Sequence, residues 1–376
     1  MKLIFKIFLV LIIFVNPALA LIDTNAKTAI IIDADTGYVL YEKNPNAKTF
    51  PASMTKIMTT MIVFEKLSNG SLTLDDTFIV SEKAWKEREG SSMFVAVVKE
   101  IRVEDLLRGI IVQSGNDACI VVAENISGSE ETFSILMNEM ASDIGLKNTN
   151  FANSTGMHSV KNYSTVKDIA LMSQYMINNY PEHYHLFSET EFEWSGINQK
   201  NRNPLLYKDI GADGLKTGYL SISGYGLAAS AKNENRRLIV VGHGFTSPQK
   251  RSQGMARLLN WGFREYTNVE LFKKDQNIGL IPISMADEDN VPLTSNKDVK
   301  ITVSKAKKNA IETEIVPVEN LRAPIKKGDV VATLKIIIPK SEIQSIDLIA
   351  AKDIAEAGYI SSFFSYLYNV FVGLFD

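Results

Sequence analysis

The chain has 376 residues, and its 40 lysines and arginines nearly balance its 43 aspartates and glutamates, for a formal net charge of −3. This length allows two domains with a sizeable core, and the balanced charge gives no reason to expect nucleic acid as a partner. The single cysteine, Cys119, cannot form an internal disulfide and lies in an apolar stretch, so we expect it to pack in the core.

The first 20 residues have the pattern of a cleavable secretory signal. Lys2 and Lys6 precede an apolar run over residues 7–15, and Ala18-Leu19-Ala20 follows it. The alternative, a retained membrane helix, is less favoured because the apolar run is short for crossing a bilayer. We therefore expect residues 1–20 to be a signal peptide, the mature chain to begin at Leu21, and the protein to be exported.

Residues 21–268 have the element pattern of an α+β domain. Two strands at residues 29–33 and 38–42 are joined by a turn at residues 35–37. The helical segments that follow are predicted at residues 53–67, 103–112, 117–126, 130–144 and 165–179. Strands at residues 215–219, 225–231 and 237–242 and a helix at residues 251–263 complete the pattern. Strands at both ends of a helical middle predict one antiparallel sheet flanked by helices.

Residues 269–350 predict a small all-β domain. Segments 299–303, 312–316 and 330–338 alternate or run apolar with many β-branched residues, and residues 326–329 have the composition of a turn. None of these segments contains a residue that suggests catalysis.

Residues 351–376 predict an amphipathic helix. The residues that fall at helical spacing are apolar: Ile360, Phe363, Phe364, Leu367, Phe371 and Leu374. Such a helix can lie in a membrane surface with its apolar face down. Lys352 is the only nearby cation, so attraction to anionic lipid would be weak. The alternative is a helix that packs on its own protein or on a dimer partner.

Three short strings occur in order along the first domain, and each suits a different part of one acyl-transfer site. The first, Ser53-Met54-Thr55-Lys56, is predicted at a helix start, where Lys56 follows Ser53 by one turn on the same face. A serine becomes a good nucleophile when an adjacent base takes its proton, and a buried lysine with a lowered pKa can be that base. This pattern alone is weak, because it recurs at residues 164, 247 and 304.

The second string, Ser114-Gly115-Asn116, supplies a hydroxyl suited to relaying a proton and an amide that can orient the base. The third, Lys216-Thr217-Gly218, places a cation and a hydroxyl on a strand beside a glycine that lets a substrate backbone approach closely. Each is the only match to its pattern in the chain. Taken singly, Ser53 could cap a helix, Ser114 could lie in a turn, and Lys216 could be a solvated charge on a strand. The ordered set favours one shared site.

With these strings in this order, the chain resembles the low-molecular-mass penicillin-binding proteins that are serine-type D-alanyl-D-alanine carboxypeptidases. The resemblance covers most of the chain from about residue 29. The further segments that carry it are Leu106-Leu107, Asp117-Ala118, Phe133, Met137-Asn138, Tyr163-Ser164-Thr165, Asp168-Ile169-Ala170, Leu258-Leu259 and Trp261-Gly262-Phe263. It implies a β-lactamase/transpeptidase-like fold, a β-rich spacer domain and a C-terminal membrane anchor.

The resemblance also implies roles for the residues of the first two strings. Ser53 would be the acylated nucleophile, Lys56 its base, and Ser114 and Asn116 the second-motif pair. The oxyanion hole would be formed by the backbone N–H groups of Ser53 and Tyr219. Some relatives have histidine where this chain has Tyr219.

The third string is implied to bind substrate. Lys216 and Thr217 would hold the terminal carboxylate, and Gly218 would lie against the substrate backbone. Arg251 either helps to hold that carboxylate or is a solvated charge at a helix start.

The implied function is removal of the terminal D-alanine from peptidoglycan stem peptides through an acyl-enzyme on Ser53, with β-lactams as covalent inhibitors. The implied location is the periplasmic side of the bacterial inner membrane, as a peripheral protein. The four histidines lack H-E-x-x-H spacing and G-x-S-x-G does not occur, so we expect no metal and no other cofactor. The alternatives are a β-lactamase, a D,D-endopeptidase, or a wall-binding or β-lactam-binding module without turnover.

Overall fold

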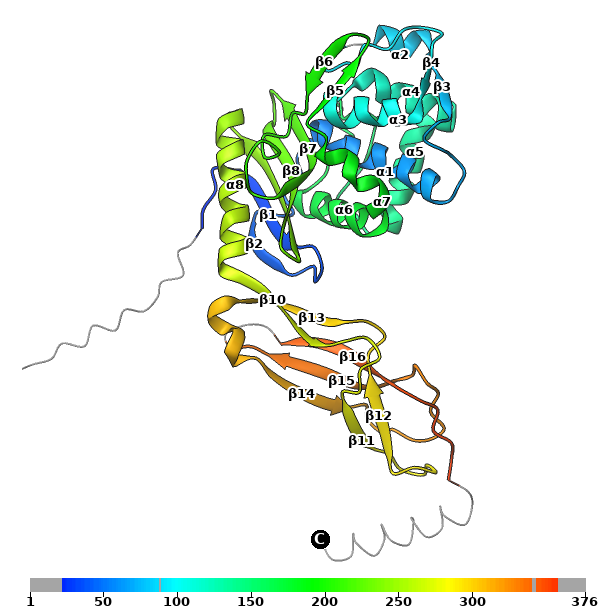
Figure 1. Ribbon diagram of the computed structural model, residues 1–376, viewed down its shortest axis with the longest axis vertical. Helices are drawn as coiled ribbons and strands as arrows, with labels where there is room; N and C mark the ends of the chain where they lie inside the picture. Colours follow the sequence, from blue (N-terminus) through cyan, green and yellow to red (C-terminus); the bar gives the residue numbers. More distant parts are fainter. Residues whose placement is uncertain (1–21, 88, 340–342, 358–376) are drawn as a thin grey trace, which may run out of the picture.

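The computed structural model describes residues 22–87, 89–339 and 343–357, which form two successive domains (Figure 1). The first combines a five-stranded sheet with helices, and the second consists mainly of strands. The predicted α+β class with a following all-β domain is therefore confirmed. Figure 1 shows the second domain extending from one end of the first. The predicted signal peptide lies outside the described residues.

The sheet of the first domain is antiparallel, with the strand order β2-β1-β9-β8-β7. Its strands are β1 (Thr28–Asp33), β2 (Val39–Lys43), β7 (Ala212–Leu220), β8 (Gly224–Asn233) and β9 (Arg236–Phe245). The N-terminal hairpin pairs with β9, so segments from both ends of the domain close one sheet, as predicted. Strand β7 forms an edge, where an extended peptide can lie alongside its backbone.

Side chains alternate along the buried strands and enter two separate cores. On β1, Ile30 and Ile32 pack beneath the helical region, whereas Ala29 and Ile31 share a core with helix α8 (Pro248–Glu265). This alternation follows from the two-residue period of a strand. The sheet is thus covered on both faces, by α8 on one side and by the other helices on the opposite side (Figure 1).

The helical region lies between β2 and β7 in the sequence. Its helices are η1 (Ala52–Thr55), α1 (Lys56–Ser68), α2 (Glu82–Lys86), α3 (Val103–Arg108), η2 (Gly109–Gln113), α4 (Asn116–Ser127), α5 (Glu130–Asp143), α6 (Val166–Asn179), α7 (Pro181–Tyr184) and η3 (His185–Ser188). Ser129 and Thr165 cap α5 and α6 with their side-chain oxygens. The pairs β3 (Thr77–Ile79) with β4 (Glu100–Arg102) and β5 (Glu191–Trp194) with β6 (Ile197–Lys200) were not predicted.

The second domain contains a pair of strands and a five-stranded sheet. β10 (Tyr266–Phe272) pairs with β13 (Val299–Ser304), and η4 (Lys305–Ala310) follows. The sheet has the order β11-β12-β16-β15-β14. Its strands are β11 (Gly279–Pro282), β12 (Asn290–Thr294), β14 (Glu312–Pro317), β15 (Val330–Ile337) and β16 (Gln344–Ala350).

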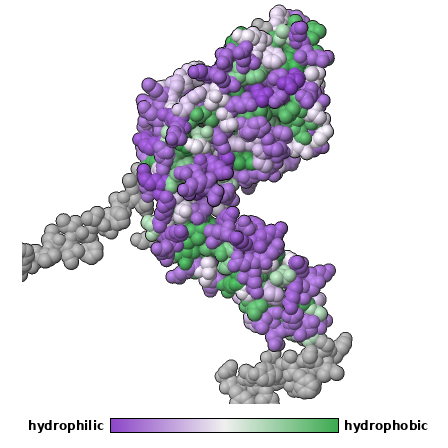
Figure 2. All heavy atoms as spheres, viewed as in Figure 1, coloured by the Kyte–Doolittle hydropathy of each residue, from purple (hydrophilic) through white to green (hydrophobic). Residues whose placement is uncertain are grey.

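The predicted boundary between this domain and a C-terminal helix is wrong. Ile354 is buried in the β-domain core and forms a bridge with Ile325, and Glu356 forms one with Ala286. Residues 351–357 therefore continue the β domain, and the rest of the predicted amphipathic helix lies outside the described residues. No helix in the described part of the chain is long and apolar enough to cross a membrane. Figure 2 shows mostly hydrophilic surface over both domains, interrupted by small hydrophobic areas.

Candidate active site

The first two motifs converge on the side chain of Lys56. Its Nζ lies 3.2 Å from Ser53 Oγ and donates a 2.7 Å hydrogen bond to Asn116 Oδ1. It also donates a 2.5 Å hydrogen bond to the backbone carbonyl of Thr155. Lys56 begins α1 and Asn116 begins α4, so two helix starts meet around one amine.

The turn that carries Ser53 differs from the predicted helix start. Residues Ala52–Thr55 form a 3₁₀ turn, and the α-helix begins only with the next residue. Ala52 has a φ of 51°, and a Cβ at Gly156 would overlap its carbonyl oxygen. On the other side, a Cβ at Gly218 would lie 2.7 Å from the carbonyl of the proline before the turn. Gly156 and Gly218 therefore pack closely against this turn. Because Gly218 belongs to the third motif, that motif contacts the first motif here.

Lys56 is fully buried, and burial lowers the pKa of its ammonium because the charged form loses its hydration. The positive charge of Arg202 acts in the same direction, whereas Asp117 and Glu130 act against it. All three hydrogen-bond partners described above are neutral groups. The lowered pKa increases the fraction of Lys56 that is neutral and can accept a proton.

The second motif is fixed by hydrogen bonds from its surroundings. Ser114 is buried, has a left-handed φ of 62°, and turns the chain from the π-helical η2 into α4. Asn116 Nδ2 donates a 2.7 Å hydrogen bond to Glu89 O, which leaves Oδ1 facing the lysine. The buried carboxylate of Asp117 accepts hydrogen bonds from the backbone N–H groups of residues 93–95. The segment beside the site is therefore tied to the start of α4.

Lys216 and Thr217 bring the third motif to the cleft from strand β7, and both are buried. Burial, with the nearby positive charges of Lys56 and Arg202, lowers the pKa of the Lys216 ammonium well below its usual value. An anionic ligand beside Lys216 would favour its charged form, because a nearby opposite charge raises the pKa of an amine.

Arg251 reaches the same strand region from α8 and is only 8% exposed, so it is not a solvated charge. Burial lowers the pKa of its guanidinium to about 10. Its Nη1 lies 3.5 Å from the carbonyl of Gly226, which pairs with Gly218 across β7 and β8. Within the described residues its Nε has no hydrogen-bond partner. A buried guanidinium with a free donor next to the third motif suits a carboxylate.

Tyr219 differs from the other predicted site residues because it is exposed. The residue is 52% exposed, and its ring stacks on Tyr225 with centroids 4.2 Å apart. Participation of its backbone N–H in an oxyanion hole stays a prediction.

Three contributors to the site carry no sequence pattern that could have identified them. Thr155 offers only its backbone carbonyl to Lys56. Glu130 Oε1 accepts hydrogen bonds from Ser154 N at 3.1 Å and from Ser154 Oγ at 2.7 Å, and so fixes the residue before that carbonyl. Arg202 lies in an irregular segment and donates to the Ser91 hydroxyl.

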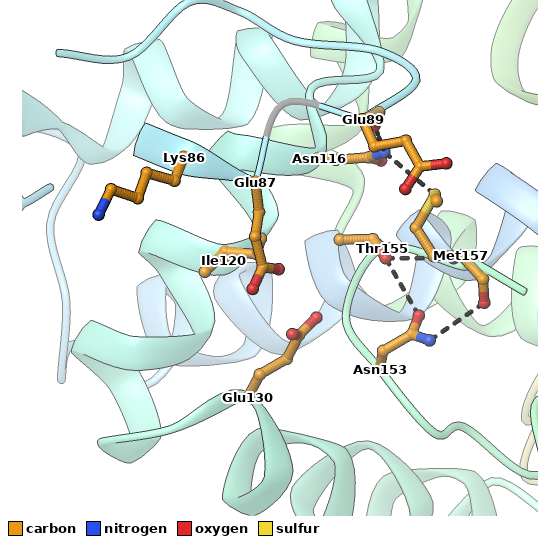
Figure 3. Close-up of a pocket in the computed structure, with 9 residues that line it drawn as sticks. All are labelled: Lys86, Glu87, Glu89, Asn116, Ile120, Glu130, Asn153, Thr155 and Met157. Atoms are coloured by element: carbon orange, nitrogen blue, oxygen red, sulfur yellow. Dashed lines mark hydrogen bonds between the residues drawn. The ribbon is translucent and has the colours of Figure 1, made fainter. Parts of the chain in front are cut away.

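A cavity of about 510 Å³ lies beside Asn116 and Thr155 (Figure 3). Figure 3 shows the carboxylates of Glu87 and Glu130 pointing into the same space from different segments. No cluster of histidine, cysteine and acidic residues among those described is arranged to hold a metal ion.

The chain is similar to known proteins over nearly its whole length. A family profile described as D-alanyl-D-alanine carboxypeptidase matches residues 15–245, and one described as Penicillin-binding protein 5, C-terminal domain, matches residues 266–356. The D-alanyl-D-alanine carboxypeptidase DacA of Haemophilus influenzae is 35% identical over 357 residues, which cover 94% of this chain and 91% of the relative. DacF of Bacillus subtilis is 36% identical over 345 residues, covering 90% and 88% respectively.

A solved structure shows the same fold. Penicillin binding protein 5 from Haemophilus influenzae aligns with a TM-score of 0.86 at 34% identity, covering 89% of this chain and 98% of that chain.

Proposed function

This chain belongs to the D-alanyl-D-alanine carboxypeptidase family and is a serine-type peptidase, and from that premise we propose that Ser53 is its nucleophile. The observation that carries this proposal is the convergence of Ser53 and Asn116 on the buried amine of Lys56. A serine next to a lysine of lowered pKa is the arrangement that covalent acyl transfer requires.

In the proposed reaction, neutral Lys56 takes the proton of Ser53 while Oγ bonds to the carbonyl carbon of the penultimate D-alanine. The backbone N–H groups of Ser53 and Tyr219 hold the resulting oxyanion. The C–N bond then breaks, and the departing D-alanine amine receives the proton from Lys56 through the Ser114 hydroxyl. In the second step, neutral Lys56 takes a proton from a water molecule, and the resulting hydroxide attacks the ester carbonyl. The bond to Ser53 Oγ then breaks, and Lys56 returns the proton to Ser53.

The terminal carboxylate of the substrate is proposed to bind to Lys216, Thr217 and Arg251. The two cations are buried, and the strand that carries the first two residues lies at the sheet edge. Gly218 keeps the strand close to the nucleophile turn. The substrate is a peptidoglycan stem peptide ending in D-alanyl-D-alanine, and β-lactams acylate Ser53 as mimics of that terminus.

Release of free D-alanine from diacetyl-L-Lys-D-Ala-D-Ala tests this proposal. The purified protein should release many equivalents, and Ser53→Ala should release none. Release of at most one equivalent would favour a binding module without turnover, and cleavage of only a cross-linked dimer would favour an endopeptidase. A penicillin acyl-enzyme that hydrolyses rapidly would favour a β-lactamase.

We also propose that residues 1–20 are removed on export and that the chain works at the periplasmic side of the inner membrane, held there by its C-terminal segment. The apolar spacing of residues 360–374 supports this proposal. Because residues 351–357 belong to the β domain, the truncation that tests it removes only residues 358–376. Cell fractionation should then show the protein leaving the membrane fraction. An unchanged membrane share would refute the anchor.

A further inference from the structure

A second cavity, of about 550 Å³, lies between the start of β1, residues 44–50 and the β7–β8 turn. Its lining residues are Lys27, Thr28, Asn44, Ala47, Lys48, Thr49, Phe50, Val160, Tyr163, Ile222, Ser223 and His243. This volume is within the range of sites that bind small molecules or a few residues of a peptide. We refer to it as the Lys27–Lys48 cavity.

The lining of the Lys27–Lys48 cavity is cationic. It contains two lysines and no aspartate or glutamate. Lys48 Nζ lies 4.1 Å from the centre of the Tyr163 ring, and the stem of Lys27 packs against Gly244, where a Cβ would lie 2.7 Å from it. Both lysines are exposed residues that line the cavity, and no carboxylate does. A concave site of one charge sign attracts ligands of the opposite charge.

The lining also contains two aromatic side chains, Phe50 and Tyr163. They provide apolar surface for the uncharged part of a ligand. Sites for small molecules and peptides combine such apolar surface with a few charged or polar groups.

Two of the segments that line the cavity adjoin active-site motifs along the chain. Phe50 lies just before the turn that carries Ser53, and Ser223 follows the strand that carries Lys216. Thr49 Oγ1 makes a 2.7 Å hydrogen bond with Nδ1 of the buried His243, which ties the first wall to β9. A ligand here would contact both segments that hold the reacting groups.

We propose that the Lys27–Lys48 cavity is a substrate subsite that binds a carboxylate of the stem peptide on the N-terminal side of D-alanyl-D-alanine. This inference rests on the proposed function, because it assigns the cavity to the same substrate. The two lysines attract the carboxylate through their positive charge. The cavity thus favours long acidic stem peptides over short neutral ones.

Three peptides test the subsite: L-Ala-γ-D-Glu-L-Lys-D-Ala-D-Ala, the same peptide with the glutamate carboxylate amidated, and diacetyl-L-Lys-D-Ala-D-Ala. The unaltered enzyme should have a kcat/KM for the acidic pentapeptide roughly three- to tenfold above that for its amide. Lys27→Gln/Lys48→Gln should abolish this preference through KM, and should leave turnover of the diacetylated peptide unchanged. Lys161→Gln, which removes a nearby exposed lysine outside the lining, should keep the preference.

The single variants Lys27→Gln and Lys48→Gln each remove one of the two charges. Each should lose part of the preference for the acidic pentapeptide, while the melting temperature and the kcat for the diacetylated peptide stay unchanged. The subsite is overturned if the acidic and amidated pentapeptides react alike, or if the double lysine variant keeps the preference. Failure of all three peptides to react would instead refute the proposed function.

Discussion

The catalytic cleft and the junction between the two domains both bury charge, but they treat it in opposite ways. At the junction, Asp33 is fully buried and accepts hydrogen bonds from Arg236 Nε at 2.8 Å and Asn268 Nδ2 at 3.0 Å. Arg236 in turn donates to the carbonyl of Tyr266, where the second domain begins. The charge on each side is matched by a partner in the protein.

The active site contains three buried basic residues, Lys56, Lys216 and Arg251. Lys56 donates to the neutral amide oxygen of Asn116, and within the described residues Arg251 Nε has no hydrogen-bond partner. Burying an unmatched ion costs several kcal/mol, and this cost is expressed as the lowered pKa values of the three groups. The protein thus stabilises its domain junction with paired charges. In the active site it leaves basic groups unpaired, because these groups must bind an anionic substrate and accept a proton.

The largest effect is expected from Lys56→Gln. Loss of the base should lower the rate of Ser53 acylation by penicillin by about 10²–10⁴-fold, the usual contribution of a positioned general base. Stopped-flow measurement of acylation checks this. Lys66→Gln, on the same helix but outside the cleft, is the matched control and should acylate normally. An unchanged rate in Lys56→Gln would show that another group activates the serine.

Asp33→Ala should remove the paired charge at the junction and leave Arg236 buried alone. We expect a loss of about 3–5 kcal/mol in the free energy of unfolding, measured by urea denaturation. At temperatures where it is folded, the variant should keep the KM and kcat of the unaltered enzyme.

Asp23→Ala provides the control for the junction, because Asp23 is 79% exposed in its ion pair with Lys43 and should contribute little. Equal destabilisation by the two substitutions would contradict the distinction between the paired junction and ordinary surface charge.

Arg251→Gln should raise KM for diacetyl-L-Lys-D-Ala-D-Ala by roughly 10–100-fold, because it removes charge-assisted hydrogen bonds to the terminal carboxylate. The corresponding peptide with a C-terminal amide should show no such difference between the two enzymes. Lys250→Gln changes the neighbouring exposed residue and should have no effect. A rise in KM that is equal for acid and amide would refute carboxylate binding by Arg251.

The smallest effect concerns Glu130. Its negative charge stabilises protonated Lys56 and so raises that pKa. Glu130→Gln, whose amide oxygen can still accept from Ser154, should therefore lower the pKa of Lys56 and move the acid limb of kcat/KM to lower pH. Glu131→Gln, at the exposed neighbour, should leave the profile in place. A shift to higher pH would contradict the assigned sign.

Much of the fold could be predicted because its elements have local signals. The hairpin at β1 and β2, the caps at Ser129 and Thr165, and the glycine-rich strands near Lys216 all carry patterns of a few residues. The short pairs β3–β4 and β5–β6 were missed because strands of three or four residues are too short for an alternation to stand out from chance.

Candidate site residues could be named from the sequence where they belong to the three strings, and the family resemblance added Tyr219 and Arg251. Thr155 contributes a backbone carbonyl, which any residue possesses, and Glu130 acts through Ser154. The 3₁₀ turn around Ser53 depends on Gly156 and Gly218, which are distant in the sequence. Tertiary contacts of this kind leave no periodicity for a single sequence to show.

Peptide mapping of the penicillin adduct tests the central claim most directly. The account predicts one penicilloyl group per molecule, located by mass spectrometry on the peptide that contains Ser53, and no adduct on Ser53→Ala. An adduct on any other residue, or undiminished labelling of Ser53→Ala, would contradict it.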